Sequence, residues 1–228
     1  MSSPIANRNR TWIQQALVRV HQILAHSNRI QKLADVIGAT VEGLLPSSVP
    51  TIRALDVGCG DMTVAETIAS RHPRIDWTCT DIHELPPSLE KSEKWKKYRR
   101  FDGLNLPFPD SIFEAVLFSD VLHHCLSAAP GLLREAARTG RYVIIKDHFE
   151  SGPVSRALLR LLDFIGNYGY GVSVPERYFD RETFASLASE CGLRIVSMNN
   201  NVAIYPAWLS PVLPPSLQFI AVLEKTPE

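Results

Sequence analysis

Apolar residues near the start of the chain recur with the spacing of a helix. Between Thr11 and Leu44 they fall every three or four residues, and Ser27-Asn28 divides the stretch into two. We therefore predict a pair of helices within residues 1–48, followed by a linker that ends at Pro50. The pair either packs against the flank of the main domain or forms a lid over a ligand site.

After Pro50 the pattern changes to short apolar runs that alternate with helical stretches. The predicted strands are residues 52–57, 75–81, 98–101, 114–119, 141–146, 194–198 and 218–223, and the predicted helices are residues 64–70, 126–137, 154–165 and 183–190. Strands that alternate with helices predict an α/β fold in which helices flank a mostly parallel sheet. We expect one such domain over residues 49–228, with the N-terminal helices as an extension.

The composition narrows the class of protein. The 228 residues are 45% hydrophobic, which is enough for a full core, and 24 basic residues balance 24 acidic ones. Because nucleic-acid binders usually carry a basic surplus, we expect no nucleic-acid partner. The sequence has no signal-peptide pattern and no apolar run of about 18 residues, so we expect a cytoplasmic protein with no membrane partner.

The segment LDVGCGDMTVAETIA, residues 55–69, has the form of a strand, a glycine turn and a helix. Gly58 and Gly60 can adopt backbone angles closed to other residues and let a ligand approach the main chain. Asp81 lies 21 residues after Gly60 and ends the next predicted strand, where an acid can accept hydrogen bonds from the ribose hydroxyls of a nucleoside. Asp102 follows the third predicted strand, where a carboxylate can accept a hydrogen bond from an adenine amino group. Together these features predict a nucleoside site.

This ordered set, completed by Phe118-Ser-Asp-Val-Leu-His-His124 after the fourth predicted strand, resembles the class I S-adenosylmethionine (SAM)-dependent methyltransferases. It is most similar to their small-molecule group, which includes ubiquinone/menaquinone-type enzymes. The resemblance covers about residues 52–150. It implies a Rossmann-like, seven-stranded fold, SAM as the cofactor, and methyl transfer to an oxygen, nitrogen or carbon atom of a small molecule.

The resemblance also implies which residues hold the cofactor. Asp56, Gly58, Cys59, Gly60 and Asp61 would lie at the methionyl end, Asp81 and Ile82 at the ribose, Asp102 and Gly103 by the adenine, and Ser119 and Asp120 near the sulfonium. Met62 departs from the family pattern, which often has glycine there. Its side chain either packs away from the ligand or narrows the methionyl pocket.

A weak nucleophile needs a general base as well as alignment with the methyl group. The candidates just past the strand ends are His123, His124, Asp147, His148, Tyr168, Tyr170 and Tyr178. We prefer His148 as the base because it follows the fifth predicted strand and titrates near neutral pH. His124, Asp147 and Tyr170 are the further catalytic candidates, and one histidine of the His123-His124 pair often packs near the cofactor in the family.

Residues 151–178 read as an insertion after the fifth strand, a place where the family carries substrate specificity. It holds an apolar helix and then a loop with three glycines and two tyrosines, Gly166-Asn-Tyr-Gly-Tyr-Gly171. Tyr168 and Tyr170 could stack on a flat or cationic substrate, or close the core of the loop. Asp147 with two histidines could suggest a metal ion, but the acid-rich arrangement of metal-dependent members is missing, so we expect no metal.

Other functions fit part of the pattern. A SAM-using enzyme of non-methyl chemistry, such as internal cyclisation or alkyl transfer from the methionyl chain, would release methylthioadenosine. A non-enzymatic subunit would have no reason to keep the five residues Asp56, Gly58, Gly60, Asp81 and Asp102. An NAD-dependent dehydrogenase fits the acid after the second strand but not the sequence of the turn. We expect a monomer or a homodimer.

Overall fold

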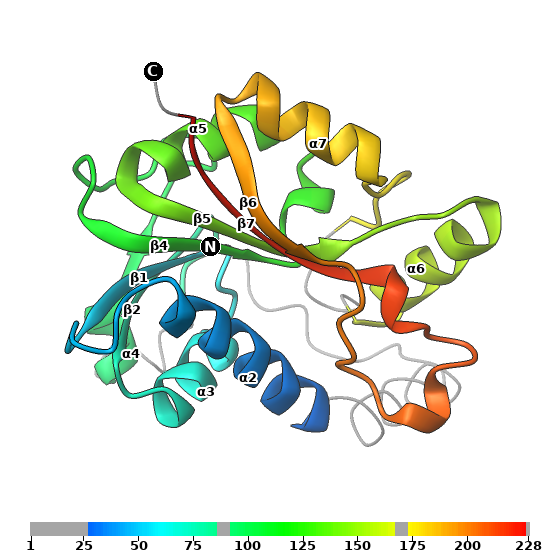
Figure 1. Ribbon diagram of the computed structural model, residues 1–228, viewed down its shortest axis with the longest axis horizontal. Helices are drawn as coiled ribbons and strands as arrows, with labels where there is room; N and C mark the ends of the chain where they lie inside the picture. Colours follow the sequence, from blue (N-terminus) through cyan, green and yellow to red (C-terminus); the bar gives the residue numbers. More distant parts are fainter. Residues whose placement is uncertain (1–26, 86–91, 167–172, 227–228) are drawn as a thin grey trace.

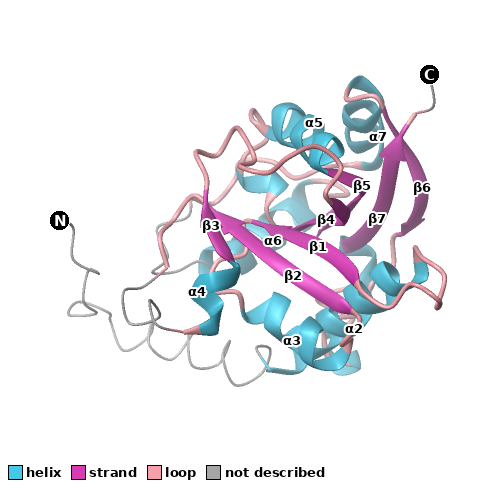
Figure 2. Ribbon diagram, turned by 90° about the vertical axis from the view of Figure 1, so that its left-hand side faces the viewer, coloured by secondary structure: helices cyan, strands magenta, loops and turns pink. Residues whose placement is uncertain are grey.

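A computed structural model describes residues 27–85, 92–166 and 173–226 of the chain. Seven strands form one sheet with helices against both faces (Figures 1 and 2). The strands are β1 Ile52–Val57, β2 Ile75–Asp81, β3 Tyr98–Arg100, β4 Phe113–Ser119, β5 Gly140–His148, β6 Leu193–Asn199 and β7 Gln218–Lys225. The α/β fold with a seven-stranded, mostly parallel sheet is confirmed. The first predicted helix and the two loop tyrosines, Tyr168 and Tyr170, lie outside the described residues.

The strand order indicates where along the sheet a ligand is expected. The order is β3-β2-β1-β4-β5-β7-β6; β1 to β5 run parallel, and β7 is antiparallel to both β5 and β6. The chain moves outward from β1 to β3 and then returns to the other side of β1 as β4. Open α/β sheets bind ligands at the carboxyl ends of the strands where the order reverses, which here are β1 and β4.

The helices form two layers. They are α2 Ser27–Gly43, α3 Thr63–Arg71, α4 Glu93–Lys97, α5 Ala129–Thr139, α6 Pro153–Gly166 and α7 Arg181–Glu190, with 3-10 turns η3 Leu122–His124, η4 Ala207–Leu209 and η5 Pro215–Leu217. Helices α5 and α7 cover one face of the sheet, and α2 and α3 cover the other (Figure 1). No helix in the described part of the chain is long and apolar enough to cross a membrane.

Helix α2 belongs to the core of the domain. Leu33, Ala34, Ile37 and Val41 recur with helical spacing and are buried in the same cluster as residues of β1, β2 and α3. The second helix of the predicted pair therefore packs on the sheet layer. Its first turn carries a charged residue, Arg29, to the carboxyl ends of the strands.

The observed elements differ from the predicted ones mainly at their ends. Strands β1 and β2 have the predicted bounds: β1 is a short, mostly apolar and buried segment, and in β2 apolar residues alternate with polar ones. The helix predicted over residues 126–137 begins only at Ala129, since residues before it form η3 and a turn, and Pro130 lies in the first helical turn where its missing N–H has no cost. Strand β5 continues to His148 because Asp147 and His148 still pair with β7.

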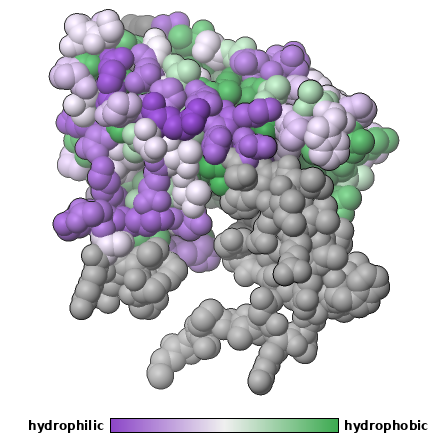
Figure 3. Space-filling model, turned by 90° about the horizontal axis from the view of Figure 1, so that it is seen from below, coloured by the Kyte–Doolittle hydropathy of each residue, from purple (hydrophilic) through white to green (hydrophobic). Residues whose placement is uncertain are grey.

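Figure 3 shows the molecule from below, where hydrophilic residues cover much of the described surface and apolar residues lie between them in scattered groups.

Candidate active site

The glycine turn joins the ends of three strands. Gly58 and Gly60 have φ angles of 77° and 55°, in the region that favours glycine. The N–H of Gly58 donates to the carbonyl of Thr80 at 2.8 Å. A Cβ on Gly58 would lie 2.6 Å from Cγ2 of Val121, which follows β4. Glycine is therefore required at position 58 for close packing of the β1 turn against the segment after β4.

Asp81 is fixed by the turn that it faces. Its Oδ2 accepts from the N–H of Gly60 at 2.9 Å, and its Oδ1 accepts from the N–H of His83 at 3.0 Å. Ile82, the next residue, exposes 48% of its surface and lies against Gly103, since a Cβ there would be 3.2 Å from Cγ2 of Ile82. The structure thus brings the expected ribose acid together with an exposed apolar side chain.

Asp102 is turned toward its own loop. One carboxylate oxygen accepts from the N–H groups of Leu104 and Asn105, at 2.8 and 2.7 Å, and the other accepts from the Asn105 amide. These hydrogen bonds, those of Asn105 first, lower the pKa of Asp102 to about 2. Both carboxylate oxygens of Asp102 thus accept hydrogen bonds from its own loop, and an adenine amino group would have to share one of them.

Asp56 is a buried acid beside a second acid. It ends β1 next to the turn and is 2% exposed. Burial, together with the negative charge of Asp81, raises the pKa of Asp56 to about 7. A cationic ligand at this point would favour the ionised form of Asp56.

The remaining turn residues have local roles. Oδ1 of Asp61 accepts from the N–H of Thr63 at 3.0 Å, at the start of α3. A hydrogen bond with Cys79 and burial raise the pKa of the Cys59 thiol, so Cys59 stays protonated. Met62 has a φ of 66° and is 2% exposed, packed in the core cluster of α2 and α3. Its side chain points into the core of the domain while its backbone adopts the conformation of a glycine.

Past the end of β4 lies a group of charged residues around Asp120. Its Oδ2 accepts from Nη2 of Arg29 at 2.8 Å, and its Oδ1 pairs with Nζ of Lys146, whose side chain is fully buried. Burial opposes the charge of Asp120, but Lys146, His148 and Arg29 hold its pKa below the usual range. Asp120 has a φ of 57° and follows Ser119, the half-buried last residue of β4.

A second charged group centres on His123. Its Nδ1 lies 2.5 Å from Oδ1 of Asp147, and its Nε2 lies 3.3 Å from Oδ2 of Asp163 in α6. The Tyr178 hydroxyl donates to the same Asp163 oxygen at 2.5 Å. Burial opposes protonation of His123, but Asp147 and then Asp163 raise its pKa to about 10. His123 is thus an imidazolium that ties the insertion to the end of β5.

His148 lies between the two groups. It is 5% exposed, and its Nδ1 lies 3.4 Å from Oδ1 of Asp120 and 3.5 Å from Oδ1 of Asp147. Burial, followed by the charge of Lys146, lowers the pKa of His148 below its ordinary value. The imidazole is therefore neutral at pH 7, as a general base must be.

His124 and Asp147 differ from His148 in their surroundings. His124 is half-buried, and its Nδ1 lies 3.1 Å from the carbonyl of Ser173, near the end of the insertion. Asp147 is 0% exposed, and its carboxylate contacts His123 and the N–H of His148 at 2.7 Å. Asp147 has no exposed surface with which to touch an acceptor; it holds the two histidines.

Three residues of these groups were not predicted as site residues. Arg29 comes from the N-terminal extension, Lys146 from the buried strand β5, and Asp163 from α6. A lysine at the end of an apolar strand, as in RYVIIK, is a signal that could have identified Lys146, since a buried lysine needs a partner. Nothing local marks Arg29 or Asp163.

Two sets of side chains place possible metal ligands close together. The ligand atoms of His123, Asp147 and His148 lie within 4.8 Å of one another, as do those of His123, His124 and Asp163. With His123 protonated, the three cations Arg29, Lys146 and His123 balance the three anions Asp120, Asp147 and Asp163. These charges are therefore matched by protons and ion pairs without a metal ion.

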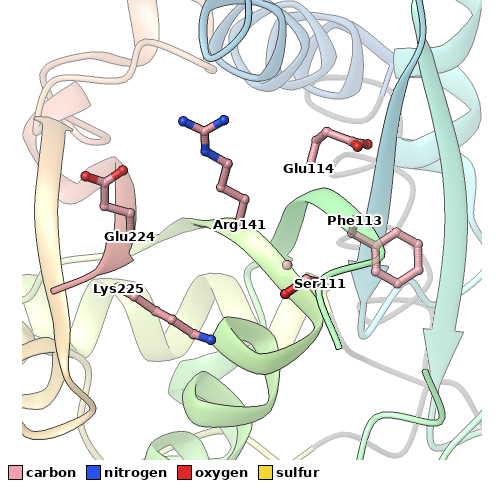
Figure 4. A pocket seen from close by; sticks show the side chains of 7 residues that line it. Ser111, Phe113, Glu114, Arg141, Glu224 and Lys225 are labelled. Carbon is pink, nitrogen blue, oxygen red and sulfur yellow. The ribbon is translucent and has the colours of Figure 1, made fainter. Parts of the chain in front are cut away.

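A surface cavity lies at the opposite end of the strands. It has a volume of about 490 Å³ and is lined by Ser111, Phe113, Glu114, Gly140, Arg141, Glu224 and Lys225 (Figure 4). Glu114 is already paired with Arg53, and Glu224 with Arg194. Because ligands of open α/β sheets bind at the carboxyl ends of the strands, we do not assign the active site to this cavity.

Comparison with known proteins identifies the central part of the chain. Residues 55–141 match the family model of the methyltransferase domain. A search of curated proteins found no significant match. The matched segment contains the glycine turn, the acids at the ends of β2 and β3, and η3.

Solved structures share the fold. The YcgJ protein from Bacillus subtilis is 16% identical, with 86% of this chain and 99% of that one covered and a TM-score of 0.57. A SAM-dependent methyltransferase from Aquifex aeolicus is 13% identical, with 95% and 100% covered and a TM-score of 0.58. The mitomycin 7-O-methyltransferase MmcR is 16% identical with a TM-score of 0.57; 94% of this chain aligns with 56% of that one. The chain therefore has the fold of class I SAM-dependent methyltransferases.

Proposed function

We propose, from the SAM-dependent methyltransferase domain that this chain carries, that the protein transfers the SAM methyl group to a small-molecule acceptor. The observation that supports this most directly is the contact between the Gly60 N–H and Asp81 Oδ2 at 2.9 Å. It builds the glycine turn and the ribose acid into one site at the carboxyl ends of β1 and β2, where the resemblance requires the cofactor.

The residues present fit SAM at each part of the molecule. Asp81 has a carboxylate for the ribose hydroxyls, and the exposed Ile82 beside Gly103 offers an apolar surface to the adenine. Asp56, with a pKa of about 7, gains a partner when the methionyl ammonium lies beside it. When bound, SAM supplies an electrophilic methyl group on a sulfonium.

The acceptor would enter between the turn and the end of β5. His148 is buried, neutral at pH 7 and adjacent to Asp120, so we propose that it removes the acceptor's proton. Asp147 holds the His148 N–H and the His123 ring and acts by positioning them. His124, which contacts the carbonyl of Ser173, would support the insertion over the acceptor.

Two features support a small molecule as the methyl acceptor: the neutral charge of the chain and the burial of the candidate side chains. The chain has no net charge, and the groups past β4 and β5 are buried, which favours a small molecule over a polyanion. We place the reaction in the cytoplasm, in a monomer or homodimer, without a metal ion. Full activity after dialysis against EDTA would support the last point, and activity restored only by an added divalent cation would reject it.

The alternative, SAM chemistry that releases methylthioadenosine, is not favoured by the match to a methyltransferase domain. The coproduct distinguishes the two. The protein would be incubated with SAM labelled with deuterium in its methyl group and with a pool of small metabolites. We expect S-adenosylhomocysteine and an acceptor that carries the label. Methylthioadenosine as the main coproduct would reject methyl transfer.

A further inference from the structure

Arg29 reaches from α2 to the residue that follows β4. Its Nη2 donates to Oδ2 of Asp120 at 2.8 Å, although the two residues are 91 positions apart. Val121, next to Asp120, packs against the Gly58 turn so closely that a Cβ on Gly58 would overlap it. The guanidinium therefore lies at the carboxyl end of β4, beside the turn assigned to the methionyl end of the cofactor.

Two cations share one carboxylate at this corner of the site. Asp120 accepts from Arg29 through Oδ2 and pairs with the fully buried Lys146 through Oδ1, while Asp147 and Asp163 pair with His123. The Arg29 guanidinium has five N–H donors, and its side chain keeps 25% of its surface exposed. Asp120 accepts from Nη2, and a ligand carboxylate can accept from the donors that remain accessible.

The proposed cofactor carries one such anion. The SAM methionyl group has an ammonium and a carboxylate, and the two acids Asp56 and Asp81 on the other side of the turn suit the ammonium and the ribose. The planar guanidinium matches a carboxylate with paired N–H donors. We propose that Arg29 binds the methionyl carboxylate of SAM, and that Asp120, itself fixed by Lys146, holds the guanidinium in position.

The surroundings of Arg29 fix its orientation. The Tyr205 ring lies under the guanidinium, with its centroid 6.0 Å from Cζ. Nζ of Lys32, one turn further along α2, donates to the carbonyl of Tyr205 at 3.3 Å. Helix α2 and the segment before η4 are thus tied together around Arg29. The N-terminal extension therefore contributes a cofactor ligand rather than only a packing face.

The test compares two ligands that differ only in the carboxylate. Dissociation constants of SAM and decarboxylated SAM would be measured by calorimetry for the wild-type protein, Arg29→Met and Arg29→Lys. A charged hydrogen bond lost with Arg29→Met should weaken SAM binding by about 10- to 100-fold and decarboxylated SAM by less than about threefold. Arg29→Lys, which keeps the charge without the planar donors, should lie between.

Arg53→Met is the matched control, because Arg53 pairs with Glu114 at the amino end of β1, away from the carboxyl ends of the strands. It should leave both affinities unchanged. Equal losses for the two ligands in Arg29→Met would show a merely structural role and overturn the proposal, as would unchanged SAM affinity. If Arg29→Met does not fold, the test is the change in the ratio of the two dissociation constants, SAM to decarboxylated SAM, between the wild type and Arg29→Lys. The proposal rests on the proposed function, and a wild-type protein that binds neither ligand would reject that function itself.

Discussion

Nδ1 of His123 lies 2.5 Å from Oδ1 of Asp147, and both side chains are completely buried. This pair joins η3 to the end of β5 and, through Nε2 of His123, to Asp163 of the insertion. Removing one partner of a buried ion pair is costly because the charge that remains is neither paired nor solvated. The pair should therefore be detectable in the stability of the whole domain.

Replacing Asp147 with Asn should lower the free energy of unfolding by about 3 kcal/mol at pH 6. The raised pKa of His123, about 10, means that its contribution is complete below pH 6.5 and is lost as the pH rises toward 10. The lowered pKa of Asp147 makes its contribution disappear only in acid, below about pH 4. Urea unfolding of both proteins at pH 6 and pH 9.5 measures this. If the difference in unfolding free energy between the wild type and Asp147→Asn grew with pH, His123 could not be an imidazolium.

His148→Ala should reduce turnover at least about tenfold while the SAM dissociation constant stays within a few-fold. In the wild type, the lowered pKa of His148 should keep the base neutral and turnover high down to about pH 6.5, with a fall in more acidic solution. The pH profile of kcat and a binding titration measure the two effects. His72→Gln is a control, since His72 pairs with Glu42 away from the carboxyl ends of the strands. Unchanged turnover in His148→Ala would remove it from the base role.

Asp56→Asn should stabilise the empty protein at pH 8 and weaken SAM binding. In the folded protein the pKa of Asp56 is about 7, above its usual value. Ionisation of Asp56 therefore lowers the free energy of unfolding as the pH rises from about 4 toward 8. An amide has no charge to bury, and we expect the melting temperature at pH 8 to rise by about 2–4 °C. At pH 4 the gain should disappear. A variant less stable than the wild type at pH 8 would contradict the raised pKa.

Met62→Gly separates packing from ligand binding. Glycine relieves the left-handed backbone of Met62 but removes a side chain that is 2% exposed in the core. The lost packing is the larger effect, so we expect unfolding free energy to fall by about 1–3 kcal/mol. SAM affinity should stay within a few-fold, because the side chain lies in the core. A large change in affinity would mean that Met62 shapes the methionyl pocket.

The sequence predicted the fold and the glycine turn more completely than the charged groups around Asp120 and His123. Strand β1 was placed correctly from its short apolar pattern and β2 from the alternation of apolar and polar residues, and Asp81 ends β2 at the expected place. Arg29 and Asp120 are brought together only when α2 packs on the sheet, and no local pattern reports a contact across 91 positions. The same holds for His123 in η3 and Asp163 in α6, which are 40 positions apart in the sequence and contact each other in the fold.

Asp102 shows a second limit of prediction from the sequence. Its position after β3 was predicted, but its carboxylate is bound by the N–H groups of Leu104 and Asn105. Asp residues bond readily to backbone groups two or three positions further on, which competes with any ligand. The spacing of an acid along the sequence gives its place at the sheet edge but not the direction of its side chain.

The most direct test of the account is thermal unfolding with SAM, S-adenosylhomocysteine and NAD, each in parallel. A ligand at about 100 times its dissociation constant adds roughly 2.7 kcal/mol, a shift of about 5–10 °C for a domain of this size. We predict such shifts with SAM and S-adenosylhomocysteine, none with NAD, and loss of the SAM shift in Asp81→Asn. No shift with SAM at millimolar concentration would mean that the glycine turn does not bind this cofactor, and the proposed methyl transfer would be rejected with it.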